Sequence, residues 1–265
     1  MEIKSTSACR LCNKVAVLRQ SHIIPHAHLK KVKGGSNQLI LFSQDINTKP
    51  IRSNTDPKEK LLCESCEHFL NSNYETYGIS VFRNSKNVRK QKNFIVINNF
   101  NYKKFYLYLI SILWRASISS LDDFNAVRLG DDLNELLRAV ILNGSLKINT
   151  SIRVDHFLRV CVLRVIDSSG TNSDETIRRM LINFNCDHSS DGKVVIFYFM
   201  VEGFLISYLF TTGDNIHDLR AGRQKSQIRN LNHAKIYKVE AGRLVEIRNI
   251  IERAVEHREK YNNEF

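Results

Sequence analysis

The sequence predicts an α+β protein with a metal-stapled N-terminal domain and a mixed α+β C-terminal region. Three observations lead to this fold class. Two Cys-X-X-Cys pairs, at residues 9–12 and 63–66, bracket the N-terminal part. All three prolines and a Gly-Gly pair fall within the first 57 residues, which favours short strands and loops there. After residue 100, helix-like and strand-like stretches follow one another without an internal repeat.

The expected elements follow in chain order. A helix is expected at 62–77, then a polar and basic linker or exposed segment at 83–100. Two more helices are expected at 101–120 and 131–143, the second with acidic residues in its first turn. The later pattern predicts, in order, a strand at 155–166, a short helix at 174–183, a pair of strands at 193–213 joined at Glu202-Gly203, and an amphipathic helix at 239–261. The expected domains are residues 1–82 and an accessory domain at 101–265.

The charge balance points to a polyanionic partner. The chain holds 39 Lys and Arg against 27 Asp and Glu, and its isoelectric point is near 9.5. Most of the surplus lies in residues 1–95, which contain 16 basic and 7 acidic residues. Such a surplus is typical of proteins that bind nucleic acid. A generically basic surface remains the alternative.

Nothing in the sequence predicts insertion into a membrane. The longest apolar stretches are short or interrupted by polar residues, and the N-terminus lacks the apolar core of a secretion signal. We therefore expect a cytoplasmic location, without a membrane partner. Paired cysteines in that reducing compartment are more often metal ligands than disulfides.

The two cysteine pairs predict a zinc site. Cys9 and Cys12 form the first pair, and Cys63 and Cys66 form the second. Each Cys-X-X-Cys turn lets two thiolates converge on one ion, and two such turns complete a tetrahedral site. A closed site of this kind is structural, because it keeps no open position for a substrate. Cys161 and Cys186 are isolated, and we expect them to be ordinary thiols.

The residues between and after the cysteine pairs carry a resemblance to a known family. Ser21-His22-Ile23-Ile24-Pro25 follows the first pair, and Leu61-Leu62 leads into the second pair and Glu67. This order resembles the HNH endonucleases of the ββα-metal superfamily, most closely a bacterial subgroup with the pattern SHIIP…LLCxxCE. The resemblance covers roughly residues 5–80. It implies a strand pair followed by a helix that together hold a nuclease site.

The resemblance also implies catalytic roles. His22 would be the general base that deprotonates water, which suits an imidazole because it titrates near neutral pH. Asn71 would hold a catalytic Mg²⁺ or Mn²⁺ ion. Two departures affect that ion: Ser21 stands where the family usually has a metal ligand, and Glu67 stands where it often has histidine. Glu75 is spaced i, i+4, i+8 with Glu67 and Asn71 on the expected helix, so it is our tentative replacement ligand. A solvated helix face is the alternative.

Two basic segments are predicted to contact nucleic acid, either DNA or RNA. The residues expected to bind phosphates are Lys30, Lys31, Lys33, Arg220, Arg223, Lys225 and Arg229. A solvated loop is the alternative for the second segment.

The leading hypothesis is therefore a metal-dependent endonuclease with a structural zinc ion. From the resemblance alone, it would be an effector in bacterial anti-phage defence, held in check by a regulatory partner such as an ATPase. The rival hypothesis is a zinc-stapled module that binds nucleic acid or a partner and has no catalytic activity. Ser21 is the residue that favours the rival.

Overall fold

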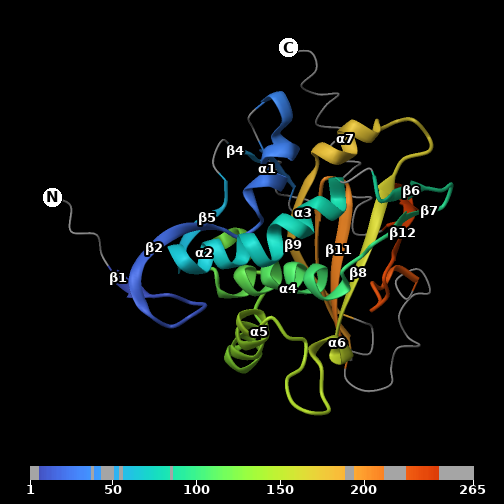
Figure 1. Cartoon of the computed structure of the whole chain (residues 1–265). Helices are drawn as coiled ribbons and strands as arrows, with labels where there is room; N and C mark the ends of the chain where they lie inside the picture. The colour runs from blue at the N-terminus through green and yellow to red at the C-terminus, as the bar shows by residue number, and fades with distance from the viewer. Residues whose placement is uncertain are drawn as a thin grey trace.

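The computed structural model describes residues 6–36, 39–42, 51–53, 56–83, 86–188, 194–211 and 225–244. Within these ranges the chain has the expected α+β class. A three-stranded sheet has the order β1-β2-β5, and a nine-stranded sheet has the order β4-β3-β9-β10-β11-β8-β12-β7-β6. Helices α3 and α4 cross one face of the large sheet, whereas α2 lies beside the small sheet (Figure 1). No helix in the described ranges has the length and apolar character that crossing a membrane requires.

The N-terminal part contains an antiparallel strand pair that runs directly into a helix. Strand β2 (Val15–His22) pairs with β1 (Thr6–Ala8) and with β5 (Lys58–Cys63), and His22 lies opposite Lys58. The chain then continues through α2 (Glu64–Leu70), one π-helical turn (Asn71–Glu75) and α3 (Thr76–Arg83). The expected helix at 62–77 is therefore present, but it contains a π-turn and is longer than expected.

The segment between β2 and β5 joins the large sheet. After Pro25 the chain forms α1 (His26–Lys33), a short 3₁₀ turn (Gly34–Ser36) and the strands β3 (Leu39–Phe42) and β4 (Ile51–Ser53). Strand β3 pairs in parallel with β9 (Leu181–His188). Two segments about 140 residues apart in the sequence thus lie next to each other in one sheet.

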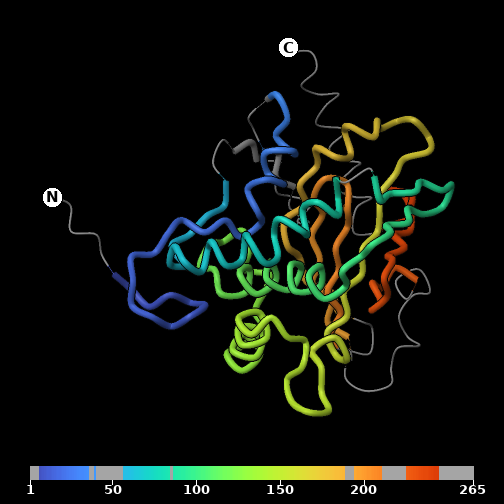
Figure 2. Tube along the Cα trace, in the orientation of Figure 1, coloured from blue at the N-terminus to red at the C-terminus, as the bar shows by residue number. Residues whose placement is uncertain are grey.

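The stretch expected to be a linker is also part of that sheet. It forms the antiparallel strands β6 (Val88–Lys90) and β7 (Phe94–Ile97). Strand β7 pairs with β12 (Ala234–Glu240), so two segments far apart in the sequence lie side by side at the right of Figure 2. The linker expectation misses these strands because both are short and because β7 also pairs with β12, which is distant in the sequence.

The C-terminal part follows the predicted order with local differences. Helix α4 (Tyr102–Ile118) and α5 (Asp131–Asn143) match their expected ranges closely. Short 3₁₀ turns occur at Asp122–Phe124 and Ala241–Arg243. The expected strand at 155–166 is divided into α6 (Val154–Phe157) and β8 (Leu158–Ile166), and the expected helix at 174–183 is shortened to α7 (Asp174–Arg179). Strands β10 (Val194–Val201) and β11 (Phe204–Thr211) form the expected pair. Of the expected helix at 239–261, residues 239–240 belong to β12 and residues 245–261 lie outside the described ranges.

The large sheet has an apolar core on each face. Successive residues of a strand point to opposite faces, and in β10 Tyr198 and Met200 belong to one cluster whereas Phe199 and Val201 belong to the other. Helix α4 covers the cluster that contains Phe199 and Val201, and it is buried along nearly its whole length. Helix α3 approaches α4 closely, because a Cβ atom added at Gly78 would lie 2.1 Å from the Tyr108 ring.

A buried ionic network ties the N-terminal helices to the large sheet. Glu202 lies in the turn between β10 and β11, and its Oε1 atom accepts hydrogen bonds from His28 Nδ1 and from Arg83 Nη2, each at 2.6 Å. The Glu202 side chain is only 3% exposed. Burial opposes its ionisation, but the hydrogen bonds from His28 and Arg83 outweigh burial, so the pKa of Glu202 lies below its usual 4.5.

This network predicts a pH-dependent effect of Glu202→Gln. Removing one partner of a buried charge pair typically costs about 3 kcal/mol, because the other charges stay buried without compensation. A depressed pKa contributes stability that is present above pH 4.5 and is lost as the pH falls through the pKa of the folded state. Urea unfolding should therefore show a large difference between variant and wild type at pH 7 that narrows below about pH 4.

The matched control is Glu175→Gln, which removes the carboxylate of the pair with Arg179, in which both side chains are exposed. We expect little change from it, because exposed ion pairs contribute little to stability. If Glu202→Gln lowered the free energy of unfolding equally at pH 7 and below about pH 4, this account of the network would be wrong.

Candidate functional site

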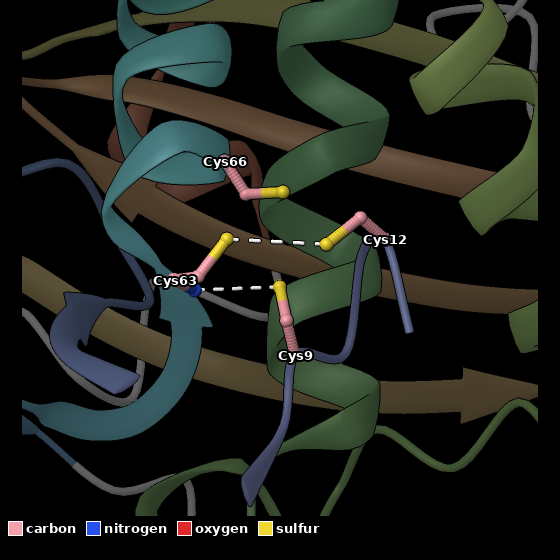
Figure 3. A group of neighbouring side chains, drawn as sticks. All are labelled: Cys9, Cys12, Cys63 and Cys66. Atoms are coloured by element: carbon pink, nitrogen blue, oxygen red, sulfur yellow. Dashed lines mark hydrogen bonds between the residues drawn. The ribbon is translucent and has the colours of Figure 1, made fainter. Parts of the chain in front are cut away.

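Four cysteine side chains converge between the small sheet and α2. Cys9 and Cys12 lie in the turn between β1 and β2, Cys63 ends β5, and Cys66 lies in the first turn of α2 (Figure 3). Their sulfur atoms all lie within 4.8 Å of one another. The structure therefore brings together all four cysteines that the sequence predicts.

The surroundings of these sulfur atoms suit a metal ion better than disulfides. Cys12 Sγ lies 3.9 Å from Cys63 Sγ, whereas a disulfide requires about 2.05 Å. The Cys63 amide donates to Cys9 Sγ at 3.3 Å, as in turns that stabilise thiolates. The positive φ of Asn13, 61°, closes the first turn. From α5, Arg138 Nη1 holds the same turn by donating to the Leu11 carbonyl at 2.6 Å.

The cysteines differ in how readily they ionise. Burial opposes the ionisation of Cys63, but hydrogen bonds from Ser65 and from the Cys66 amide outweigh it and lower the pKa of Cys63 to about 6. Burial and the neighbouring sulfur atoms raise the pKa of Cys66. Four thiolates at this spacing need a cation to balance their charge, and Zn²⁺ is the ion that a set of four sulfur ligands favours. The cluster is thus compatible with a zinc site.

A second cluster surrounds His22. His22 ends β2, His26 begins α1, and Asp56 lies just before β5. Ligand atoms of these three side chains lie within 4.8 Å of one another. Asp56 Oδ2 lies 2.8 Å from His26 Nδ1 and 3.6 Å from His22 Nε2. The other oxygen of Asp56 pairs with Lys33 Nζ at 2.7 Å.

The backbone fixes the position of His22. Ile23 and Ile24, which follow it, are completely buried and anchor the end of β2. Arg115, on α4, donates from Nη1 to the His22 carbonyl at 2.9 Å. The His22 side chain keeps 28% of its surface exposed, so its ring remains accessible to water.

The surroundings of His22 favour its neutral form. Burial lowers the pKa of His22 most, and the charge of His26 lowers it further, while Asp56 opposes both. Asp56 stays ionised, because hydrogen bonds from Lys33 and His26 outweigh the effect of burial and lower the pKa of Asp56. At neutral pH the cluster therefore presents a neutral imidazole beside a carboxylate, and a neutral imidazole can act as a general base.

The cluster can also offer ligands to a divalent ion. One carboxylate and two imidazoles form a donor set that suits Mn²⁺ or another transition-metal ion better than Mg²⁺. The ammonium of Lys33 at 2.7 Å from Asp56 would have to move away from such an ion.

The other residues expected near the catalytic ion lie in different surroundings. Ser21 is completely buried. Its hydroxyl accepts a hydrogen bond from the Leu62 amide and donates one to the Glu67 carboxylate. Glu75 pairs with Arg115 at 2.7 Å, so its charge is already neutralised. Asn71 is exposed on the π-helical turn.

The basic residues expected to bind nucleic acid are only partly described. Lys30 and Lys31 are exposed on α1, whereas Lys33 is mostly buried against Asp56. Lys225 and Arg229 are exposed near β12. Arg220 and Arg223 lie outside the described residues.

Sequence reasoning missed Asp56, and it gave His26 no assigned role. The pairing of β2 with β5 reveals the position of Asp56. It sets His22 opposite Lys58, and Asp56, two positions before Lys58, therefore lies close to the His22 ring. The 35 residues between His22 and Lys58 conceal that proximity in the sequence. Comparisons with protein-family models, with curated proteins and with solved structures found no match.

Proposed function

We propose that this protein is a metal-dependent HNH-type endonuclease that hydrolyses phosphodiester bonds in nucleic acid. The observation that carries the proposal is the neutral, water-accessible His22 beside the Asp56 carboxylate, at the end of a strand whose partner runs into a helix. That order of strand, strand and helix is what the resemblance to the HNH endonucleases implies. The four-cysteine cluster at the strand–helix junction supports the same interpretation.

The arrangement suggests how the residues divide the work. Asp56 lies on the Nε2 side of His22, which leaves Nδ1 to accept a proton from water. The resulting hydroxide attacks phosphorus, the bond to the 3′ oxygen breaks, and that oxygen takes up a proton from solvent water. Asp56 stabilises the imidazolium that forms, and Arg115 holds the His22 backbone in place. The products would carry 5′-phosphate and 3′-hydroxyl ends.

A divalent ion fits the acidic side of this cluster. Asp56 and His26 would hold it, whereas Asn71 and Glu75, the ligands expected from the sequence, lie outside this cluster. When bound, the ion would neutralise charge on the phosphate and on the leaving oxygen. The exposed Lys30 and Lys31, on α1 beside His26, would contact neighbouring phosphates.

The proposal is tested by incubating the purified protein with plasmid, single-stranded DNA and tRNA. We expect cleavage of at least one substrate with Mg²⁺ or Mn²⁺ and none without a divalent ion. The ends of the products should be open to ligation but not to 5′ phosphorylation until the terminal phosphate is removed. Cleavage that leaves a 3′-phosphate or a cyclic phosphate would contradict the mechanism.

A specific observation supports the rival, a binding module without catalytic activity. Ser21 and Arg115 engage the two carboxylates, Glu67 and Glu75, that would otherwise supply ligands to the ion. Tight binding of nucleic acid with no cleavage of any substrate, under any divalent ion, would favour this rival.

A further inference from the structure

A basic surface lies at the end of the large sheet that β6, β7 and β12 form. The two chain segments that meet there, residues 86–121 and 225–239, contain no Asp or Glu. Strand β12 lies next to β7, and the Lys238 ammonium, which donates to the Gln91 carbonyl at 2.8 Å, fastens β12 to the β6–β7 turn. The fold thus concentrates positive charge that is spread over two distant parts of the sequence.

The strand register places cations and rings on one face. Arg89 pairs with Val96, and Val96 pairs with Lys235, so these three side chains form one row. Phe94 and Tyr237 form the next row on the same face. Lys235 Nζ lies 4.6 Å from the centre of the Phe94 ring and 6.0 Å from that of Tyr237. Ile236, which points to the opposite face, is buried in the core.

A hollow of about 210 Å³ opens on this face. We call it the basic hollow; its lining includes Lys225, Arg229, Leu231, His233, Lys235 and Tyr237. The three cations are exposed, and among the described residues they form no ion pair with a carboxylate. Leu231 keeps 48% of its surface exposed. The hollow therefore combines uncompensated positive charge with accessible apolar and aromatic surface.

We propose that the basic hollow is a docking site for single-stranded nucleic acid. Phosphates would lie against Lys225, Arg229 and Lys235, and an unpaired base would stack against Tyr237 or His233. Single-strand binding sites combine a basic groove with aromatic side chains in this way. A duplex keeps its bases stacked inside the helix, so it would use the charge of the hollow but not its rings. The inference rests on the proposed nucleic-acid function and assigns a substrate class to it.

The basic hollow is separate from the His22 cluster. Helix α1, which carries His26, contacts β3 and β10, whereas the hollow lies on β12. Strands β3 and β12 are five positions apart in the sheet order, about 24 Å at the usual spacing of about 4.8 Å. In Figure 2, α1 and β12 likewise lie over different parts of the sheet. A strand held at the hollow would be bound independently of the histidines.

The test is binding of fluorescently labelled 20-nucleotide single strands of DNA and RNA, measured by anisotropy in the zinc-loaded protein without added Mg²⁺ or Mn²⁺. The triple variant Lys225→Ala, Arg229→Ala, Lys235→Ala should raise Kd at least tenfold. Because each phosphate contact contributes about 0.7 to the salt slope for single strands, the slope of log Kd against log salt should fall by about 2. Tyr237→Leu, which keeps apolar packing, should weaken binding about fivefold with little change in the salt slope.

The matched control removes the same charge elsewhere, through Lys14→Ala, Lys60→Ala and Lys147→Ala at exposed positions. We expect less than a twofold change in Kd. An equal loss of affinity in the two triple variants overturns the proposal, as does a preference for duplex of equal length or for vesicles of anionic lipid. Cleavage by the His22 site has no part in this assay. A protein that binds single strands at the hollow but never cleaves would refute the proposed function and leave this inference standing.

Discussion

Replacement of His22 by alanine is expected to reduce nucleic-acid cleavage by about 10²- to 10⁴-fold, the usual contribution of a general base. The reason is that His22, whose pKa is lowered mainly by burial, presents a neutral ring beside Asp56 with part of its surface open to water. His26 already bonds Asp56 through Nδ1, and its ring is offset from that of His22 by 5.0 Å. It is therefore poorly placed to substitute as the base.

The fold should survive this change. The His22 side chain is partly exposed, and the contact from Arg115 is made to the backbone carbonyl, which alanine retains. Zinc content and thermal unfolding of His22→Ala should therefore match the wild type. His68→Ala is the control, because His68 is exposed on α2 of the same domain. Cleavage rates under initial-rate conditions decide the matter: a His22→Ala variant as active as His68→Ala would end the mechanism proposed for His22.

The second large effect is expected at the cysteine cluster. Cys63→Ser should abolish the binding of one zinc ion per chain and destabilise the N-terminal part by several kcal/mol, out of a total that is typically about 5–15 kcal/mol. Structural zinc contributes binding energy directly to folding. Substitution of Cys63 should affect both zinc binding and stability strongly, because Cys63 joins the end of β5 to the start of α2 and its amide also contacts Cys9.

The loss of structure should be local. One face of strands β8, β9, β10 and β11 packs in an apolar cluster that contains none of the four clustered cysteines, and these strands also pair with one another. Hydrogen exchange should thus speed up in β1, β2 and α2, while amides of the central strands stay protected. Cys186→Ser is the matched control, since Cys186 lies far along the chain in β9 and should leave zinc content unchanged. Elemental analysis that finds no zinc in the wild type, or full zinc in Cys63→Ser, would contradict the prediction.

Local patterns in the sequence predict much of this molecule. The cysteine turns, α4, α5 and the β10–β11 pair each depend on residues close together in the chain, and each agrees with the structure. Strands β6, β7, β9 and β12 do not follow from the sequence pattern: β6 and β7 are short, and β7, β9 and β12 each also pair with a strand far away in the sequence.

The expected row of ligands on the helix shows a different limit. Glu67, Asn71 and Glu75 would share a face only if every turn had the α-helical period. The π-helical turn at Asn71–Glu75 adds a residue to that period and rotates the residues after it. Ser21 and Arg115 then bind the two carboxylates. Neither the turn nor these partners can be derived from spacing alone.

Because β3 pairs with β9, part of the N-terminal segment can complete its native contacts only late in synthesis. Strand β3 and helix α1 leave the ribosome early, but β9 begins only at Leu181, about 140 residues later. Glu202, which binds His28, is made later still. The histidine-bearing segment therefore completes its native contacts only when most of the chain has been translated. A fragment that ends before β9 lacks those contacts, so it would hold α1, and with it His26, less firmly than the finished chain does.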